Sequence, residues 1–491
     1  MFKAWRARAA VGLVAATLAL AASPATADVS LQPPGWDKDL RLAEAPDLNP
    51  DPHIVEINIE ARVAPVELEP GKRVDAWTYN GGIPGPLVRV QVGDRLIVHF
   101  SNHLPMETTI HWHGLRVPIQ MDGVPEVSQP PVPTGGTFTY DFVVPDAGLF
   151  WYHPHVMSAA QVGFGLYGAL LVEDPADPVK VPDQTVLVLS DIGIDDHGAL
   201  ESPDSGGSTG MAFGREGNLV LVNGRVRPRI EARAGAPQRW RIVNAAKSRY
   251  FGIDLDGELI TRIGGDGGFT EYPVESDTLV LAPGERADVI VVPRRAPGRE
   301  IIVRTIPYNR GYGSVEFRSA DDLIVIALAA TPAYAGPPVP ALLGARRTIE
   351  PISTAGATSV NIDFTIAQLG NGTFVYGVNG VPFATHHSIA AKPGETQVWT
   401  IVNKTKWSHP FHLHGFFFQV IDEKGQPVRP LEWKDTVNVP FEQTVRVVVQ
   451  YDDRQGNWMF HCHILDHADG GLMGTVAVGD IAPKAHTHLQ P

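Results

Sequence analysis

The 491-residue chain contains one cysteine, Cys462, so an intrachain disulfide is excluded. A lone cysteine in a globular protein is most often a small buried apolar side chain. Its neighbours argue against that interpretation here, because His461 and His463 flank it and His467 follows closely. A thiol among imidazoles is typical of a metal site.

Long apolar runs are also scarce. Three basic residues (Lys3, Arg6 and Arg8) precede an apolar run over 11–22 and an Ala-Thr-Ala sequence at 25–27. This pattern predicts a signal peptide at 1–27 and a mature chain that begins at Asp28. No other stretch approaches the ~20 apolar residues of a spanning helix. We therefore expect a periplasmic or secreted product with no membrane insertion; the basic residues leave Sec and Tat export equally open.

A basic surface is missing as well. The formal net charge is -14, which makes nucleic acid an unsuitable partner.

Forty-two prolines and 49 glycines interrupt the chain so often that long helices have little room, which predicts an all-β protein. The length suits about three domains of roughly 150 residues.

Three internal repeats divide the chain. Each begins with an Asn-Gly turn (at 80, 223 and 379) and continues through a Gly-centred turn (at 93, 235 and 394) to a strand that ends in Asn102, Asn244 or Asn403. The strands over 95–100, 239–243 and 397–402 alternate as in half-buried antiparallel sheets. With linker-like composition over 173–183 and 329–340, we expect three Greek-key β-sandwich domains at 28–175, 176–335 and 336–482, followed by a tail at 483–491.

Histidines are paired far more often than chance allows. Random placement of 18 histidines predicts fewer than one His-x-His pair, whereas the sequence has five: His111/His113, His153/His155, His412/His414, His461/His463 and His486/His488. Residues i and i+2 of a strand point to the same face, so each pair presents two imidazoles to one space. The last pair lies in the tail and is interpreted as a solvated end.

The repeat register shows how one site is assembled from two domains. His111 follows Asn102 by nine residues and His412 follows Asn403 by nine, whereas the middle repeat has Asp254 and Asp256 on the corresponding strand. Trp-Tyr-His-Pro-His at 151–155 matches Met-Phe-His-Cys-His at 459–463. The first domain therefore offers histidines without a thiol and the middle domain neither. The cluster is expected between the first and third domains.

In these motifs the chain resembles the blue multicopper oxidases, the family of laccases and bacterial cuprous oxidases. His-Trp-His-Gly at 111, His-Pro-His at 153, His-Pro-Phe-His-Leu-His-Gly at 409 and His-Cys-His-x-x-x-His at 461 occur in the family's order. The resemblance implies three cupredoxin-like domains and four copper ions. It assigns the ligands as His409, Cys462 and His467 for type 1, His111 and His412 for type 2, and His113, His153, His463 with His155, His414, His461 for the type 3 pair.

The resemblance also suggests further site residues. Asp122, eleven residues after His111, and Asp469, near the final motif, are candidates for relaying protons, although Asp122 also suits an ordinary Asp-Gly turn and relatives often have Glu where Ala468 stands. Leu472, ten residues after Cys462, stands where many relatives have an axial methionine, and leucine cannot coordinate the type 1 copper. The alternative is that Met473 takes the axial place through a one-residue shift. The remaining histidines fit no motif and are interpreted as ordinary core or surface residues: His53, His99, His103, His197, His386 and His387.

The function that follows is laccase-like. Four one-electron oxidations of a donor, with phenols or aromatic amines as the leading class, are coupled to reduction of O2 to water. A cuprous or metal-ion oxidase is the alternative, although the chain has only seven methionines to serve as soft Cu(I) ligands. The complete ligand set argues against a copper-free scaffold and against a copper nitrite reductase. All motifs lie in one chain, so a monomer is sufficient.

Overall fold

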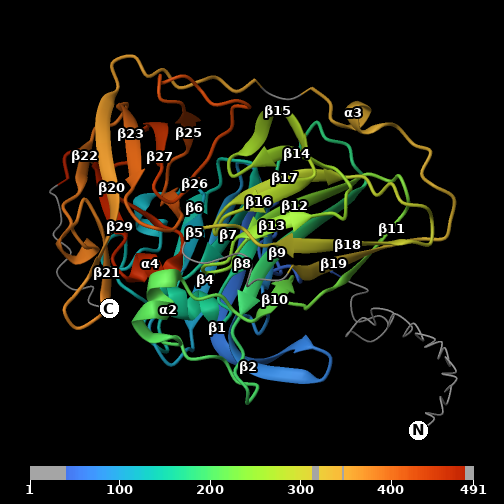
Figure 1. Ribbon diagram of the computed structural model, residues 1–491, viewed down its shortest axis with the longest axis horizontal. Helices are drawn as coiled ribbons and strands as arrows, with labels where there is room; N and C mark the ends of the chain where they lie inside the picture. Colours follow the sequence, from blue (N-terminus) through green and yellow to red (C-terminus); the bar gives the residue numbers. More distant parts are fainter. Residues whose placement is uncertain (1–39, 312–319, 346–347, 482–491) are drawn as a thin grey trace, which may run out of the picture.

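Residues 40–311, 320–345 and 348–481 are described by the computed structural model. The signal peptide predicted at 1–27 and the His486/His488 pair lie outside these residues. Within them, six sheets form three consecutive sandwiches, each with its own apolar core. Figure 1 shows the third sandwich (orange and red) on the left and the second (green and yellow) on the right, with the first behind and below. The predicted all-β class is confirmed.

The first sandwich packs one four-stranded sheet on another. In spatial order the sheets are β2 (Lys72–Tyr79), β1 (Ile54–Glu69), β4 (Arg95–Asn102) and β6 (Thr137–Val143), and β3 (Gly85–Gln91), β8 (Gly168–Glu173), β7 (Gly148–His153) and β5 (His111–His113).

The second sandwich has a six-stranded and a five-stranded sheet. Their strands are β10 (Leu219–Val222), β9 (Asp183–Ile192), β12 (Gln238–Asn244), β17 (Arg286–Val291), β14 (Ile260–Gly265) and β15 (Gly268–Ser276), and β11 (Arg229–Ala232), β19 (Asp321–Leu328), β18 (Glu300–Ile306), β13 (Phe251–Asp254) and β16 (Thr278–Leu281).

The third sandwich has two five-stranded sheets. Their strands are β21 (Phe374–Val378), β20 (Thr358–Gln368), β23 (Thr396–Asn403), β27 (Thr444–Gln450) and β25 (Phe418–Ile421), and β22 (Ile389–Ala391), β29 (Met473–Val478), β28 (Gly456–Cys462), β24 (His409–Leu413) and β26 (Thr436–Val439). The strands thus fall within the three predicted domains, whose exact boundaries stay a prediction.

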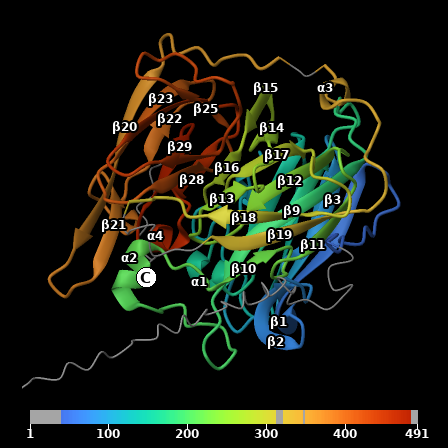
Figure 2. The same ribbon diagram turned by 45° about the vertical axis from the view of Figure 1, so that its right-hand side comes forward.

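Helices are short throughout the part of the chain that the structure describes. They are η1 (Ile119–Met121), α1 (Ser158–Gly163), α2 (Gly207–Phe213), α3 (Val339–Leu342), η3 (Phe383–Thr385) and α4 (Leu465–Asp469). None of them has the length and apolar character needed to cross a membrane. Figures 1 and 2 both show that α2, from the second sandwich, lies beside α4 of the third.

The predicted repeat corresponds to a repeated hydrogen-bond arrangement. The side-chain amides of Asn102 and Asn244 each donate to two carbonyls of the following chain, and that of Asn403 donates to three. Each amide oxygen accepts the N–H two residues later. Buried amides that are satisfied in this way fix the loop after the strand. This fixed loop sets the position of the next strand, which is β5, β13 or β24.

The expectation that the strands after the Gly-centred turns lie in half-buried antiparallel sheets was wrong in part. The strands β4, β12 and β23 each have one antiparallel neighbour but pair in parallel with β1, β9 and β20. Alternation along a strand reports which face is buried and carries no information on a neighbour's direction. In addition, β12 is buried at every position, since its sheet packs on β7 of the first sandwich.

Candidate metal centre

Two antiparallel strand pairs bring the His-x-His motifs together. In the first sandwich, β5 pairs with β7 so that His111 lies opposite His153. In the third, β24 pairs with β28 so that His412 lies opposite His461. Register in each pair therefore aligns two motifs that are far apart in sequence, and the predicted cluster between the first and third domains is present.

The cluster consists of eight buried imidazoles. His111 stacks on His414 across the two domains with ring centroids 3.9 Å apart, and His113 stacks on His412 at 3.8 Å. Groups with ligand atoms close enough to hold one ion include His155/His414/His461, His111/His113/His153 and His111/His412/His414. The ring of His463 lies 4.9 Å from that of His113.

These groups match the expected type 3 set of His155, His414 and His461. The other two expected sets, His113/His153/His463 and His111/His412, do not appear as separate groups. Their members lie close together but are distributed over groups that share residues. His463 lies beside His113 and His153 (ring centroids 5.5 Å apart from the latter), and the rings of His111 and His412 are 5.9 Å apart. The division of the eight imidazoles among individual ions stays a prediction.

The ring nitrogens of the cluster are arranged for a cation. Buried nitrogens without a hydrogen-bond partner are Nε2 of His111, His153, His155 and His412, Nδ1 of His113 and both ring nitrogens of His463. Burial lowers the pKa of His113, His153, His155 and His463 well below the usual histidine value, and neighbouring imidazoles add to this effect. Neutral imidazoles with free lone pairs are the ligands that copper requires.

A second group lies on the opposite side of β28. His409 Nδ1 is 3.0 Å from His467 Nδ1 and 3.3 Å from the Cys462 sulfur, which is 3.7 Å from His467 Nδ1. These distances leave a point about 2 Å from each of the three atoms, and about 2 Å is the length of a metal–imidazole bond. The three residues are fully buried.

The surroundings of this triad favour a metal over a free thiol. Burial raises the pKa of the Cys462 thiol, so a thiolate at this position requires an adjacent cation. Thr405 Oγ1 lies 2.7 Å from His409 Nε2 and already donates to Asn403 and to the Trp407 carbonyl. It therefore accepts the Nε2–H, which leaves Nδ1 of His409 free to coordinate. Two imidazoles and a thiolate fit a blue copper site.

Comparison with known proteins supports this interpretation. Three family models described as Multicopper oxidase match residues 60–177, 183–311 and 355–481. Multicopper oxidase MmcO of Mycobacterium tuberculosis is 33% identical, with 82% of this chain and 83% of the relative covered. The chain belongs to the multicopper oxidase family. As a multicopper oxidase it is a copper-dependent oxidoreductase that uses O2.

Other relatives differ in what their names say. A laccase of Bacillus subtilis is 27% identical over 82% of this multicopper oxidase and 90% of the relative. Among solved structures, a multi-copper oxidase from Pseudomonas thermotolerans has a TM-score of 0.74 and 33% identity, covering 87% of this chain and 99% of its own. One from Campylobacter jejuni, titled a metallo-oxidase, has a TM-score of 0.79 and 28% identity, covering 90% and 94%. The cupredoxin-like character of the three sandwiches is thereby confirmed.

The axial assignment of Leu472 stays a prediction, and the surroundings of this side chain are compatible with it. Leu472 is fully buried in the same apolar cluster as Cys462, and its carbonyl accepts the Cys462 N–H at 3.0 Å. Met473, the competing candidate, packs in a different cluster with Val124, Phe383 and Met459. The two side chains therefore occupy opposite sides of the strand.

The two candidate acids are both buried but have different partners. Asp122 contacts the cluster of eight imidazoles. Its Oδ2 lies 3.0 Å from His414 Nδ1, and its carbonyl oxygen lies 2.7 Å from His111 Nδ1. The chain bends at Asp122, and Gly123 follows it with a φ of 80°. Asp469 accepts the N–H groups of Ser158 and Ala159 at the start of α1. Burial raises the pKa of Asp469 to about 7. The relay roles stay predictions.

The six histidines outside the motifs belong to none of the metal-type groups found among the described residues. Three of them lie near carboxylates, as His99 does 2.7 Å from Glu56, and His386 packs against Phe460.

Sequence reasoning missed Asp435. Its carboxylate Oδ1 lies 3.1 Å from His113 Nε2, and its carbonyl lies 2.9 Å from His412 Nδ1. It is flanked by Lys434 and Thr436, and nothing in that segment marks it as different from other Asp residues. Its position follows from the pairing of β24 with β26, which places Thr436 opposite His412 and becomes known only from the structure.

Proposed function

We propose that this multicopper oxidase is laccase-like, coupling four one-electron oxidations of phenols or aromatic amines to the four-electron reduction of O2 to two waters. The observation that carries the proposal is the position of Cys462 between His461 and His463 at the end of β28. The thiol faces one group and both imidazoles face the other, so a covalent path of a few bonds joins them. Electrons accepted at the triad can thus reach the site where O2 is reduced.

The proposed cofactor is four copper ions. His409, Cys462 and His467 would hold the type 1 ion, and the eight clustered imidazoles would hold one type 2 and two type 3 ions as the family pattern assigns them. Copper supplies one-electron chemistry at both places when it is bound. The protein's own part is to keep the imidazoles neutral, oriented and away from bulk water.

The surface above the triad supports an aromatic donor. Because His467 is fully buried, an electron-donating substrate cannot touch it directly and contacts the residues that cover it. Tyr376 stacks on His467 at 4.5 Å and donates to the Ala212 carbonyl in α2, while Trp407 donates to the Tyr376 hydroxyl. Phe213, which is 37% exposed, meets Trp407 edge-on. The partly exposed rings of Phe213 and Trp407 offer stacking partners to phenols and aromatic amines.

A metal-ion oxidase is the second candidate. Met211 lies on α2 and packs against the apolar core around the triad, which places one thioether in the segment that covers His467. Thioethers bind Cu(I), but a single one is a weak site compared with a methionine-rich segment.

We also propose that the protein acts in the periplasm or after secretion, as the pattern at 1–27 suggests, and that it acts as a monomer. Recovery of a product that starts at Asp28 from the extracytoplasmic fraction would test the location.

Steady-state O2 consumption with a panel of phenols and aromatic amines, compared with Cu(I), decides between the two candidates. We expect four donor electrons per O2, no released peroxide and higher kcat/KM for at least one phenol than for Cu(I). Preference for Cu(I) would identify a metal oxidase. Failure of the copper-loaded protein to consume O2 with every donor would overturn both.

A further inference from the structure

The middle domain contributes side chains to the region around the histidine cluster, among them a buried arginine. Arg286, at the start of β17, is fully buried where the three domains meet. Its Nε donates to the Leu149 carbonyl of the first domain at 3.2 Å, and its two terminal nitrogens donate to the carbonyls of Gly284 and Asp266 at 3.0 Å each.

The same guanidinium forms an ion pair with Asp435 of the third domain. Nη1 donates to Asp435 Oδ1 at 2.7 Å, and Nη2 donates to Oδ2. Both carboxylate oxygens are thus held by one planar fork, the geometry that arginine provides and lysine does not. A carboxylate this deeply buried needs such a partner to stay charged.

Asp435 in turn determines which nitrogens of two histidines carry a proton. His113 presents Nε2 to the carboxylate, and its Nδ1 is buried without a partner. His412 presents Nδ1 to the Asp435 carbonyl, and its Nε2 is likewise without a partner. The nitrogen that donates to Asp435 is protonated, so the other nitrogen of each ring carries the lone pair.

The first domain leaves space for this arrangement at Gly114. A β-carbon at that position would come 2.4 Å from Arg286 Nη2 and 2.7 Å from Asp435 Oδ2, and the residue has a φ of 87°. The glycine that ends His-Trp-His-Gly is therefore required for the Arg286–Asp435 pair to approach the histidines.

We propose that Arg286 of the middle domain is a positioning residue for the type 2/type 3 cluster, and that it acts by holding Asp435 so that His113 and His412 present their free nitrogens to the metal. This inference rests on the proposed function. It gives the middle domain a role in the cluster, although none of the metal-type groups among the described residues includes a side chain of that domain.

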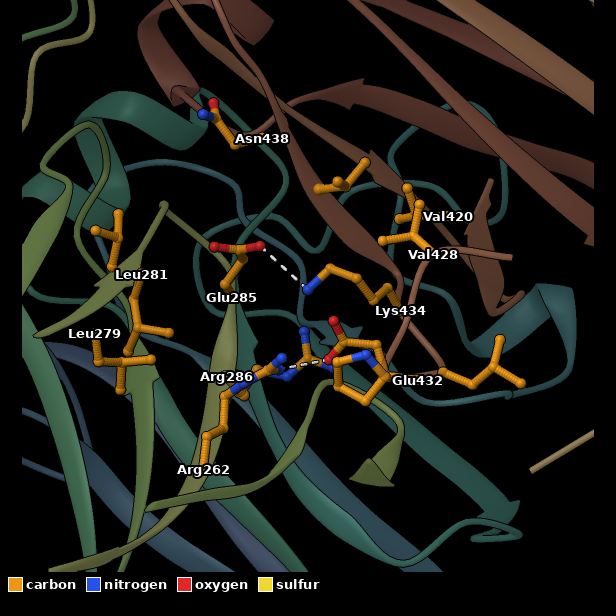
Figure 3. A pocket seen from close by; sticks show the side chains of 14 residues that line it. Arg262, Leu279, Leu281, Glu285, Arg286, Val420, Val428, Glu432, Lys434 and Asn438 are labelled. Atoms are coloured by element: carbon orange, nitrogen blue, oxygen red, sulfur yellow. Dashed lines mark hydrogen bonds and ion pairs between the residues drawn. The ribbon is translucent and has the colours of Figure 1, made fainter. Parts of the chain in front are cut away.

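The same interface offers a matched control. A cavity of about 370 Å³ opens between the second and third domains, and Figure 3 shows Arg262 paired with Glu432 and Lys434 paired with Glu285 in its wall. Arg262 Nη1 donates to Glu432 Oε2 at 2.6 Å, but neither residue touches a histidine in the cluster. Arg262→Gln therefore removes an interdomain arginine–carboxylate pair and leaves Asp435 in place.

The test compares wild type, Arg286→Gln, Arg286→Lys, Asp435→Asn and Arg262→Gln after loading at limiting free copper. Copper per chain, the type 2 electron paramagnetic resonance signal and the blue absorption are measured, with thermal unfolding of the metal-free proteins. In Arg286→Gln we expect the cluster's copper affinity to fall about 10- to 100-fold, with an altered type 2 signal and unchanged blue absorption. Arg286→Lys should be intermediate, and Arg262→Gln should match wild type.

An Arg286→Gln protein with wild-type copper content and type 2 signal would overturn the inference. So would parallel loss of cluster copper and blue absorption, which would mean general destabilisation. If Arg286→Gln does not fold, Asp435→Asn decides, because the carbonyl contacts of Arg286 remain: weaker cluster copper is expected, and wild-type affinity refutes the role. A wild-type protein that binds no copper would overturn the proposed function and this inference with it.

Discussion

Replacing Leu472 with methionine should lower the reduction potential of the type 1 copper. Leu472 is buried beside Cys462 and has no donor atom, whereas a thioether at the same place can donate weakly to the metal and stabilise Cu(II). The expected shift is several tens of millivolts, or ~1 to 2 kcal/mol at about 59 mV per tenfold change for one electron. Because leucine and methionine have similar volumes, the substitution should cost less than about 1.5 kcal/mol of stability.

A redox titration of the blue absorption measures this shift, with chemical unfolding as the stability control. Met473→Leu is the matched variant, since Met473 packs against Val124 and Met459 on the other side of the strand. It should leave the potential nearly unchanged. A larger shift in Met473→Leu than in Leu472→Met would refute the axial assignment.

Three further outcomes are expected. Cys462→Ser should abolish the blue absorption, because serine cannot supply the thiolate; a blue variant would remove the triad from consideration. His412→Ala should deplete cluster copper and stop O2 consumption while the blue colour remains, and His111→Ala should behave alike; colour loss with retained O2 consumption would reverse the assignment of the two sites. Asn403→Ala should lower the free energy of unfolding by about 1–3 kcal/mol in a denaturant titration, since the carbonyls of Trp407 and Val439 lose a buried donor; an unchanged midpoint would show that the loop does not depend on this amide.

The sequence alone located the ligand motifs because they combine two local rules. Alternation places His111 and His113 on one face. The same nine-residue spacing from Asn102 to His111 and from Asn403 to His412 marks equivalent strands in two repeats. Both rules act over a few residues, so they can be applied without knowing the tertiary structure.

Contacts between domains could not be predicted in this way. Arg286 and Asp435 are 149 residues apart, and neither lies in a motif. Their pairing depends on how three sandwiches pack, and on the absence of a side chain at Gly114. The parallel partners of β4, β12 and β23 were missed for the same kind of reason, because a strand's own sequence does not specify its neighbours' direction.

The alternation along β28 has a consequence for the order of folding and metallation. His412 pairs with His461 and Phe411 with Cys462 across the β24–β28 ladder, so a slip of one residue would turn the thiol toward the imidazole cluster and both histidines away from it. Copper that bound to a slipped ladder would meet the thiol on the side of the imidazole cluster, and its binding would stabilise the wrong pairing. Correct assembly is therefore favoured when β24 and β28 pair before the metal binds.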